Sequence, residues 1–322
     1  MKILVTGCAG FVGYHLCKRL LKNKDHKIYG VDNLNNYYSL GLKKLRLKKI
    51  RIKKNFFFYK IDKSNFKKLK SIFKKNKFDI IINLAAQAGV RYSISNPKAY
   101  FNSNISGFFN LAELSRIYGI KKIFYASSSS VYGEKKKFPL NEREIVNPKN
   151  IYSLSKKNNE DVAQIYSNYY NINFVGLRLF TIYGDWGRPD MLIIKYITAA
   201  VKNKKFYLNN YGKHFRDFTH INDVVNNILI LMKKNFKKKH MIFNICSNNP
   251  VSLKFILKLL DKEFGKPKII KRTKQLADVY KTHGDNKKLI SVTKYKNFVD
   301  IKVGLIEVIN WAKENINFLK KN

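Results

Sequence analysis

Cysteines and long apolar runs are scarce in this chain of 322 residues. Its three cysteines, Cys8, Cys17 and Cys246, show no metal-binding spacing, so we expect no metal site and a reducing compartment. No apolar stretch approaches the roughly 18 residues that a membrane-spanning helix needs. The N-terminal apolar run is broken by glycines from Gly7 onward, unlike a signal peptide. These shortages predict a soluble cytoplasmic protein that does not insert into a membrane.

Acidic residues are also few, with 21 Asp and Glu against 64 Lys and Arg, a formal net charge of +43 and a pI near 10.1. Such a charge normally suggests binding to nucleic acid or to an anionic membrane. The excess here is almost all lysine, spread from end to end among many Asn, Ile, Phe and Tyr residues. That mixture is typical of drift in an AT-rich coding sequence, whereas specific DNA readers favour arginine at base contacts. We therefore expect no specific nucleic-acid partner.

Apolar residues are plentiful enough for a substantial core. Hydrophobic residues make up 45% of the chain and aromatic residues 14%, which argues against disorder. The length allows one large domain or two smaller ones. Apolar strands alternate with helices over the first ~180 residues, which predicts an α/β fold with a doubly wound parallel sheet.

A glycine-rich turn follows the first predicted strand, Lys2–Thr6, and precedes a helix expected from about Tyr14 to Lys22. Glycines at such a turn allow a tight bend, close approach of the backbone to a pyrophosphate, and close packing of helix on strand. The helix N-terminus adds amide donors for the phosphates. An ordinary tight turn is the alternative. The predicted cofactor-binding residues here are Gly7, Gly10, Phe11, Val12 and Gly13.

An acidic residue ends the second predicted strand, Lys27–Val31. Asp32 stands 19 positions after Gly13. A carboxylate at this place accepts hydrogen bonds from the adenosine ribose and repels a 2′-phosphate. The pattern therefore predicts NAD rather than NADP, with Asp32 and its neighbour Asn33 in the cofactor site.

Two more predicted strands complete the cofactor cleft. Phe56–Tyr59 is the third strand, and Asp62 lies just beyond its end, where it can contact adenine. Phe78–Ala86 is predicted as a buried parallel strand because its apolar run is continuous. Its last residues leave room for a cofactor to cross the strand end: Leu84, Ala85 and Ala86.

Tyr152 and Lys156 stand four residues apart, and in a helix that spacing puts them on one face. A nearby fixed cation favours phenolate and would lower the pKa of Tyr152 below its usual value of about 10. A serine hydroxyl could then bridge the phenolate to a substrate alcohol, and Ser128 lies in a serine run, Ser127–Ser130, upstream. Chance can also produce this spacing in a chain rich in Tyr and Lys, so the interpretation depends on the preceding motifs.

The remaining elements are predicted more coarsely. Leu42–Lys54 alternates basic and apolar residues and is expected to be a helix with a solvated lysine face. Ile105–Tyr118 is expected to be an amphipathic helix. Phe174–Phe180 is a predicted strand that ends in Thr181–Gly184. Lys233–His240 is expected to be a basic surface turn.

In this order the motifs resemble extended short-chain dehydrogenase/reductases, and among them nucleotide-sugar epimerases, over nearly the whole chain. The matching motifs are Thr6-Gly7-x-x-Gly10-x-x-Gly13, Asp32-Asn33-Leu34, Leu84 to Arg91, Ser-Ser-Val-Tyr132-Gly133, Tyr152-x-x-x-Lys156 and Arg216-Asp217-Phe218. The similarity is closest to UDP-glucuronate 4-epimerases, through Asn36-Tyr37-Tyr38, Gln87 to Ser93, and Arg178 to Met191.

The resemblance implies a domain division and an assembly. Residues 1–180 would form the NAD-binding Rossmann domain, with 217–248 returning to it. Residues 181–216 and 249–322 would form a smaller C-terminal domain that binds the nucleotide sugar. The relatives also suggest a homodimer through the helices that contain Ile105 and Tyr152.

The mechanism implied by the resemblance uses tightly held NAD to epimerise C4 of a UDP-sugar through a transient 4-keto sugar. Tyr152 would take the proton of the 4-hydroxyl and share that hydrogen bond with Ser128, while Lys156 lowers the Tyr pKa and holds the nicotinamide ribose. Arg91 and Arg216 would bind the diphosphate or close the site. Their alternative role is that of surface charges on loops.

The resemblance also suggests which sugar is used. Ser129 and Ser130 occupy positions where dehydratases carry acids, and with Thr181 they offer neutral hydroxyl donors to a C6 carboxylate. Arg188 offers a planar fork suited to the same group, unless it binds diphosphate or caps a loop. We therefore expect interconversion of UDP-glucuronate and UDP-galacturonate for polysaccharide biosynthesis. The turn with the substrate-binding candidates Gln275 and Asp278 departs from the usual Gln-Pro-Gly-Asp pattern, so its loop geometry is open.

Other activities remain as alternatives. A UDP-glucose 4-epimerase, a sugar 4,6-dehydratase or a UDP-glucuronate decarboxylase would share most motifs, although a dehydratase lacks its acids here. A non-catalytic protein that binds NAD or nucleic acid on the same fold is a more remote alternative. The intact set of Ser128, Tyr152 and Lys156 argues against it.

Overall fold

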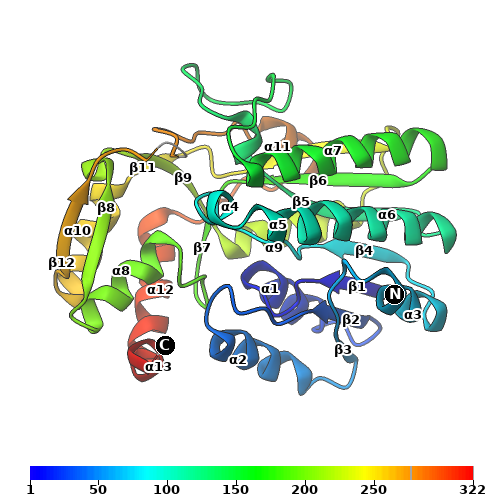
Figure 1. Cartoon of the computed structure of the whole chain (residues 1–322), viewed down its shortest axis with the longest axis horizontal. Helices are drawn as coiled ribbons and strands as arrows, with labels where there is room; N and C mark the ends of the chain where they lie inside the picture. Colours follow the sequence, from blue (N-terminus) through cyan, green and yellow to red (C-terminus); the bar gives the residue numbers. More distant parts are fainter. Residues whose placement is uncertain (276–277, 322) are drawn as a thin grey trace.

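A large parallel sheet forms the centre of the computed structural model, which describes residues 1–275 and 278–321. Its seven strands run in the order β10-β6-β5-β4-β1-β2-β3, and every neighbouring pair is parallel (Figure 1). The strands are β1 (Lys2–Thr6), β2 (Lys27–Asp32), β3 (Phe56–Lys60), β4 (Ile80–Asn83), β5 (Lys122–Ser128), β6 (Asn173–Leu179) and β10 (His240–Ile245). This confirms the predicted doubly wound sheet.

Helices cover both faces of the sheet because its strands are apolar on both sides. In β1, Ile3 and Val5 pack toward one helical layer and Leu4 toward the other. The first layer contains α1 (Phe11–Leu20), α2 (Leu40–Arg51), α9 (Ile221–Met232) and α11 (Lys287–Thr293). The second contains α3 (Phe66–Lys75), α6 (Gly107–Ile117) and α7 (Ile151–Tyr170). Continuous apolar runs in the sequence are thus explained by burial on two faces.

A smaller unit lies beside the carboxyl ends of these strands. It contains a sheet of β7 (Thr181–Tyr183), β9 (Phe215–His220) and β11 (Pro250–Ser252), and a parallel pair of β8 (Lys205–Asn209) and β12 (Lys268–Arg272). Its helices are α8 (Leu192–Val201), α10 (Leu253–Phe264), α12 (Ile301–Glu314) and α13 (Ile316–Lys321). Figure 1 shows β8, β12 and α10 at the far side from β1 to β3. The helix α9 and the strand β10 lie between β9 and β11 in sequence, but they belong to the large sheet and its first helical layer.

The helix expected at Ile105–Tyr118 begins earlier and less regularly. After the short helices α4 (Tyr92–Ser95) and α5 (Pro97–Tyr100), a π-helical segment, η1 (Phe101–Ser106), leads into α6. Asn104 in that segment donates to the Gln87 carbonyl at 3.0 Å and to Ser155 Oγ at 2.9 Å. Single π turns are frequent at functional sites, and here one points a buried amide toward α7.

Two other expectations need correction. The strand predicted to continue through Thr181–Gly184 stops at Leu179, and Thr181–Tyr183 pairs with β9 in the smaller sheet instead. The basic face of α2 is only partly solvated, because Lys43 and Arg46 are buried and donate to backbone carbonyls. No helix among the described residues combines the length and apolar character needed to cross a membrane.

Candidate active site

A cavity of about 940 Å³ lies across the carboxyl ends of the central strands, between the two units. It is lined by predicted cofactor-binding residues on one side and by predicted sugar-binding residues on the other. Gln275 is the one predicted site residue outside this lining, and its carbonyl accepts from the Asp278 N–H at 3.0 Å. In open α/β sheets ligands bind at this edge, so the fold brings the predicted residues to the expected place.

The glycine turn can form only with glycines. Gly7 has a φ of +74°, and a Cβ there would lie 2.7 Å from the Ala85 nitrogen. A Cβ on Gly13 would lie 2.0 Å from the Gly7 carbonyl oxygen. Gly10 is the N-cap of α1, and no side chain caps its first amides. The bare N-terminus of α1 therefore faces the cavity as a site for a phosphate group.

Asp32 ends β2 at the cavity wall. Its carboxylate accepts from the Ala9 N–H at 3.1 Å and from the Leu34 N–H at 2.9 Å. Burial raises the pKa of Asp32, and these amides and Lys43 partly oppose that shift. Nearby, Asn33 Nδ2 donates to Asp62 Oδ2 at 2.8 Å, so the ends of β2 and β3 are tied together. The arrangement fits an adenosine half with a free ribose hydroxyl.

Tyr152 and Lys156 occupy the first two turns of α7. The helix starts with a capping box in which the Asn150 side chain accepts from the Ser153 N–H at 2.9 Å. Lys156 Nζ donates to the Ala126 carbonyl at 2.7 Å and lies 5.9 Å from the centre of the Tyr152 ring. Burial lowers the pKa of Lys156 to about 8. Both side chains reach the cavity, as their spacing predicted.

We expected Lys156 to lower the pKa of Tyr152, and this expectation is wrong. Burial raises the pKa of Tyr152, while a hydrogen bond with Ser128 and the charge of Arg188 act to lower it. Lys156 is held by a carbonyl of β5 and is not among the groups that shift this pKa. Ser128 and Arg188 are therefore the electrostatic partners of the phenol.

Ser128 is oriented by the short helix that it caps, η2 (Ser129–Tyr132). Its Oγ accepts from the Ser130 N–H at 3.2 Å and from Ser130 Oγ at 3.0 Å. A hydroxyl has two acceptor sites and one donor. Because both acceptor sites are used, the remaining proton is available to Tyr152 or to a substrate oxygen.

Arg188 lines the cavity and is paired with an acid, Asp190, although the sequence analysis placed no acid beside it. Its Nε donates to Asp190 Oδ1 at 3.0 Å and its terminal NH2 group to Asp190 Oδ2 at 2.5 Å. Tyr37 donates to the same carboxylate at 3.1 Å. Burial alone would lower the pKa of Arg188, but Asp190 outweighs it, so the pKa is raised. The other guanidinium edge is not used by Asp190.

The two other predicted arginines meet at the segment that begins with Asp278. Arg91 makes an ion pair with Asp278 at 2.6 Å. Arg216 donates to the carbonyls of Val279 at 2.9 Å and of Tyr280 at 3.1 Å. Burial lowers the pKa of Arg216 to about 10. Both cations line the cavity, where a diphosphate can be neutralised.

Comparison with known proteins identifies the family. Residues 3–246 match the model of the NAD dependent epimerase/dehydratase family. The chain is 36% identical to the UDP-glucuronate 4-epimerase of Thermodesulfobacterium geofontis over 321 residues, which is 98% of each protein. The chain belongs to the NAD dependent epimerase/dehydratase family.

Solved structures agree with this assignment. The UDP-glucuronic acid 4-epimerase of Bacillus cereus, crystallised with UDP-glucuronic acid and NAD, matches with a TM-score of 0.92 and 29% identity over 98% of this chain and 99% of that chain. A UDP-glucose 4-epimerase of Thermotoga maritima, crystallised with UDP-glucose, matches with a TM-score of 0.89 and 26% identity over 98% of this chain and all of that chain.

Membership of the NAD dependent epimerase/dehydratase family confirms the predicted family and the predicted cofactor. The residues present fit that cofactor: the glycine turn leaves no room for a Cβ, the α1 amides are uncapped, and Asp32 lines the cavity with a carboxylate suited to ribose hydroxyls. Ala85 and Ala86 also line the cavity, where their small side chains leave room for the cofactor.

The sequence analysis did not identify three residues that line the cavity: Tyr37, Asp190 and Lys63. Tyr37 and Asp190 reach the cavity and hold Arg188, and the two-residue step from Arg188 to Asp190 could have indicated an ion pair. Lys63 is buried and donates to Asn83 Oδ1 at 3.1 Å and to the Ala85 carbonyl at 2.7 Å. Burial lowers the pKa of Lys63 well below its usual value. No signal distinguishes Lys63 from the many surface lysines around it.

Proposed function

We propose that this chain interconverts UDP-glucuronate and UDP-galacturonate by epimerisation at C4. The observation that carries this proposal is the placement of Tyr152, Ser128 and Arg188 around one cavity. Tyr152 and Ser128 supply a base and a hydroxyl, and the charge of the Arg188 guanidinium acts on the same phenol. That set can handle an alcohol and a carboxylate on one sugar ring.

Each protein group has a distinct task. Tyr152 takes the proton from the 4-hydroxyl and later returns it, and Ser128 donates its free proton to the same oxygens. When bound, NAD supplies the acceptor and donor of the hydride at C4. Lys156 donates to the Ala126 carbonyl, and its ammonium group would hold the ribose of the cofactor. The resulting 4-keto sugar turns its other face before it is reduced, which inverts C4.

The carboxylate end explains why a uronate is preferred. A 4-keto uronate is a β-keto acid and loses CO₂ unless its carboxylate is held. The edge of Arg188 that Asp190 does not use can bind two carboxylate oxygens in parallel, and Ser129, Ser130 and Thr181 are neutral and line the same cavity. Asp190 holds the opposite edge of Arg188 and fixes its direction. Arg91 and Arg216 are proposed to bind the diphosphate, with Asp278 as their support.

UDP-glucose epimerisation is the second candidate. A solved UDP-glucose 4-epimerase shares the fold along the entire length. The neutral serines and Thr181 could also accept a C6 hydroxyl. The presence of Arg188 in the cavity favours the uronate, because a buried guanidinium gains more from an anion than from an alcohol.

The proposal includes a division of labour within the chain. Residues 1–180 and 217–248 would form the cofactor-binding part, and 181–216 and 249–322 would complete the sugar-nucleotide site, with the strand β9 (Phe215–His220) paired inside the smaller unit. The three cysteines are free and buried, which fits a reducing compartment such as the cytoplasm.

We also propose a homodimer formed by α6 and α7. Apolar side chains on these helices and on η1 remain exposed: Phe101, Phe109, Leu154, Ile165 and Tyr169, with exposed fractions of 49% to 77%. Leu154, Ile165 and Tyr169 share one helical face, since their spacings are multiples of a helical turn. An apolar face of this extent is best covered by the same face of a second copy.

Purified protein incubated separately with UDP-glucuronate and UDP-glucose tests the substrate, with the products separated by chromatography. We expect UDP-galacturonate to form much faster than UDP-galactose. Arg188→Ala should reduce uronate turnover selectively and release some decarboxylated pentose, while Arg51→Ala, an exposed arginine on α2, should behave as wild type. A wild-type preference for UDP-glucose would refute the uronate assignment.

A further inference from the structure

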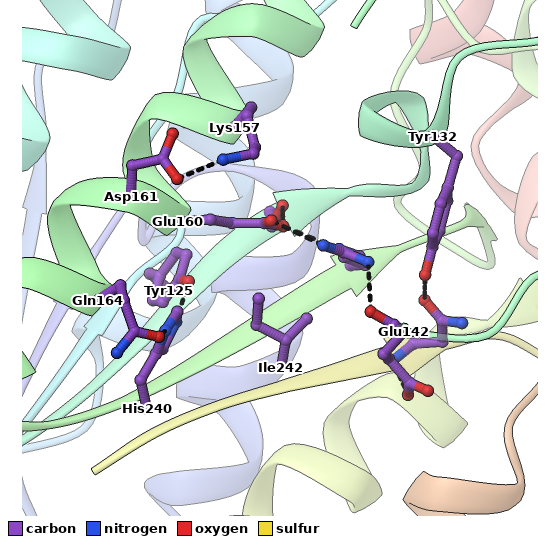
Figure 2. Close-up of polar contacts among 12 residues, drawn as sticks. Tyr125, Tyr132, Glu142, Lys157, Glu160, Asp161, Gln164, His240 and Ile242 are labelled. Atoms are coloured by element: carbon purple, nitrogen blue, oxygen red, sulfur yellow. Dashed lines mark hydrogen bonds and ion pairs between the residues drawn. The ribbon is translucent and has the colours of Figure 1, made fainter. Parts of the chain in front are cut away.

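A buried ion pair joins the strand after the active-site helix to the helix itself. Arg178 on β6 and Glu160 on α7 each expose only 4% of their side chains. Arg178 Nε donates to Glu160 Oε1 at 2.9 Å, and its NH2 group donates to Oε2 at 2.8 Å (Figure 2). This is a fork-to-fork contact, the most directional of ion pairs.

Glu160 also holds one end of the serine segment, residues 127–132. Ser127 Oγ donates to Glu160 Oε1 at 2.6 Å, and Ser127 directly precedes Ser128. Glu160 follows Lys156 by four residues and Tyr152 by eight, so all three lie toward the same side of α7. The carboxylate therefore connects the helix that carries the base to the strand that carries the serine.

Arg178 contacts the other end of that segment. The guanidinium carbon lies 4.8 Å from the centre of the Tyr132 ring. Tyr132 in turn donates to Asn244 Oδ1 at 2.7 Å, which anchors the ring on β10 (Figure 2). Ser128, Ser129 and Ser130 lie between the two contacts. The ion pair thus grips both ends of the short stretch that lines the sugar side of the cavity.

Stability alone does not account for such a pair. Removing two charges from water costs several kcal/mol per ion, and the attraction repays this only when geometry and extra hydrogen bonds are good. Here the extra partners are Ser127, the Glu142 carbonyl at 3.4 Å and the Tyr132 ring. Apolar side chains of the same size would pack there equally well but would not specify the register of β5 against α7.

We propose that Arg178 and Glu160 are positioning residues, which hold the serine segment on α7 and so set the place of Ser128 relative to Tyr152. Neither residue touches the sugar or the cofactor in this role. The inference rests on the proposed function, because it concerns the alignment of the base and the serine. A shift of about 1 Å between such groups can cost about 100-fold in rate.

Three variants separate positioning from stability. Glu160→Gln keeps the size and removes the charge, and Ser127→Ala removes one contact without burying an unpaired charge. Tyr125→Phe is the matched control, since Tyr125 on β5 is fully buried, contacts His240 at 2.8 Å and is not among the residues that line the cavity. Each is assayed for kcat, KM, bound NAD, thermal midpoint, and amide hydrogen exchange over residues 127–132.

We expect Glu160→Gln to lower kcat by about 10- to 100-fold with KM and NAD content near wild type, because no binding surface has changed. Ser127→Ala should show a smaller loss of the same kind. Both should speed amide exchange in residues 127–132. Tyr125→Phe should lower the thermal midpoint and leave kcat and this exchange unchanged.

Unchanged kcat and unchanged exchange in folded Glu160→Gln would overturn the positioning role. The positioning role would also be overturned if the loss of kcat followed the fall in thermal midpoint equally in all three variants. If Glu160→Gln does not fold, Ser127→Ala decides by the same criteria. If wild-type protein epimerises no UDP-sugar, the proposed function fails, and the exchange measurements still decide whether the pair holds the segment.

Discussion

The phenol that we propose as the base, that of Tyr152, interacts with two side chains that come from other elements. Ser128 has both acceptor sites occupied by Ser130, so its proton points outward, and Arg188 supplies positive charge. Burial nevertheless raises the pKa of Tyr152.

Replacing Tyr152 by Phe should lower epimerisation by at least about 100-fold, because a positioned proton acceptor is lost. Affinity for the UDP-sugar should remain near wild type, since the arginines that face it are unchanged. Turnover measured by chromatography and binding measured by calorimetry check this. Tyr169→Phe, an exposed tyrosine on the same helix, is the control. Turnover of Tyr152→Phe at the wild-type rate would show that another group is the base.

Local spacing identified residues that the structure brings to one cavity, and their chemical roles stay predictions. The glycine turn, Asp32 and the Tyr152–Lys156 pair are all short-range patterns, and each lies in the cavity. Asp190 and Lys63 were missed because their roles depend on which atoms they face after folding. The same limit explains the wrong partner for Tyr152, since a carbonyl of β5 holds Lys156 at a place that spacing does not show.

At the scale of elements, α7 presents two different faces. Its inner face carries Tyr152, Lys156 and Glu160, and its outer face carries exposed Leu154 and Ile165. The exposed apolar residues of the outer face are the ones that we propose for the contact with a second copy.

Ile165→Glu should convert a dimer into monomers, because it places a carboxylate inside an apolar contact. Val303→Glu is the matched control: Val303 on α12 is 54% exposed and Ile165 53%, but Val303 lies away from α6 and α7. Sedimentation at equal protein concentration measures the change. A monomeric wild type, or equal effects of both substitutions, would contradict the proposed interface.

Element types were predicted better than their ends. Parallel strands are recognisable because burial on both faces makes their apolar runs continuous. The π-helical start at Phe101 and the transfer of Thr181–Tyr183 to a second sheet follow instead from partners distant in sequence, Gln87 and Ser155 in one case and β9 in the other. Periodicity contains no information on such contacts.

At the scale of the whole molecule, buried histidines make stability depend on pH. Burial lowers the pKa of His15 to about 3 and the pKa values of His214 and His220 to about 4. Between the ordinary histidine pKa of about 6.5 and these values, the unfolded chain binds protons that the folded chain does not. Stability is therefore fully present above about pH 6.5 and is lost as pH falls.

The thermal midpoint should accordingly drop between pH 6.5 and about 5, with each buried histidine contributing roughly 1.5 kcal/mol to the loss. His15→Gln should reduce the fall of the thermal midpoint with pH by the contribution of one histidine. Buried carboxyls such as Asp217, whose pKa is raised by burial, oppose the trend, because the folded chain binds their protons more readily than the unfolded chain does. Calorimetry in matched ionic strength measures the slope. A midpoint that stays level or rises toward pH 5 would contradict the prediction.

Lys63 and Gly107 place a constraint on how this chain can diverge. The stem of Lys63 crosses α6 so closely that a Cβ at position 107 would lie 2.8 Å from Lys63 Cγ. A side chain at position 107 would therefore force the stem of Lys63 to shift. The two positions must change together: a homologue with alanine or serine at 107 should carry a shorter residue at 63, and a lineage that lost this glycine first would have to pass through a less stable ancestor.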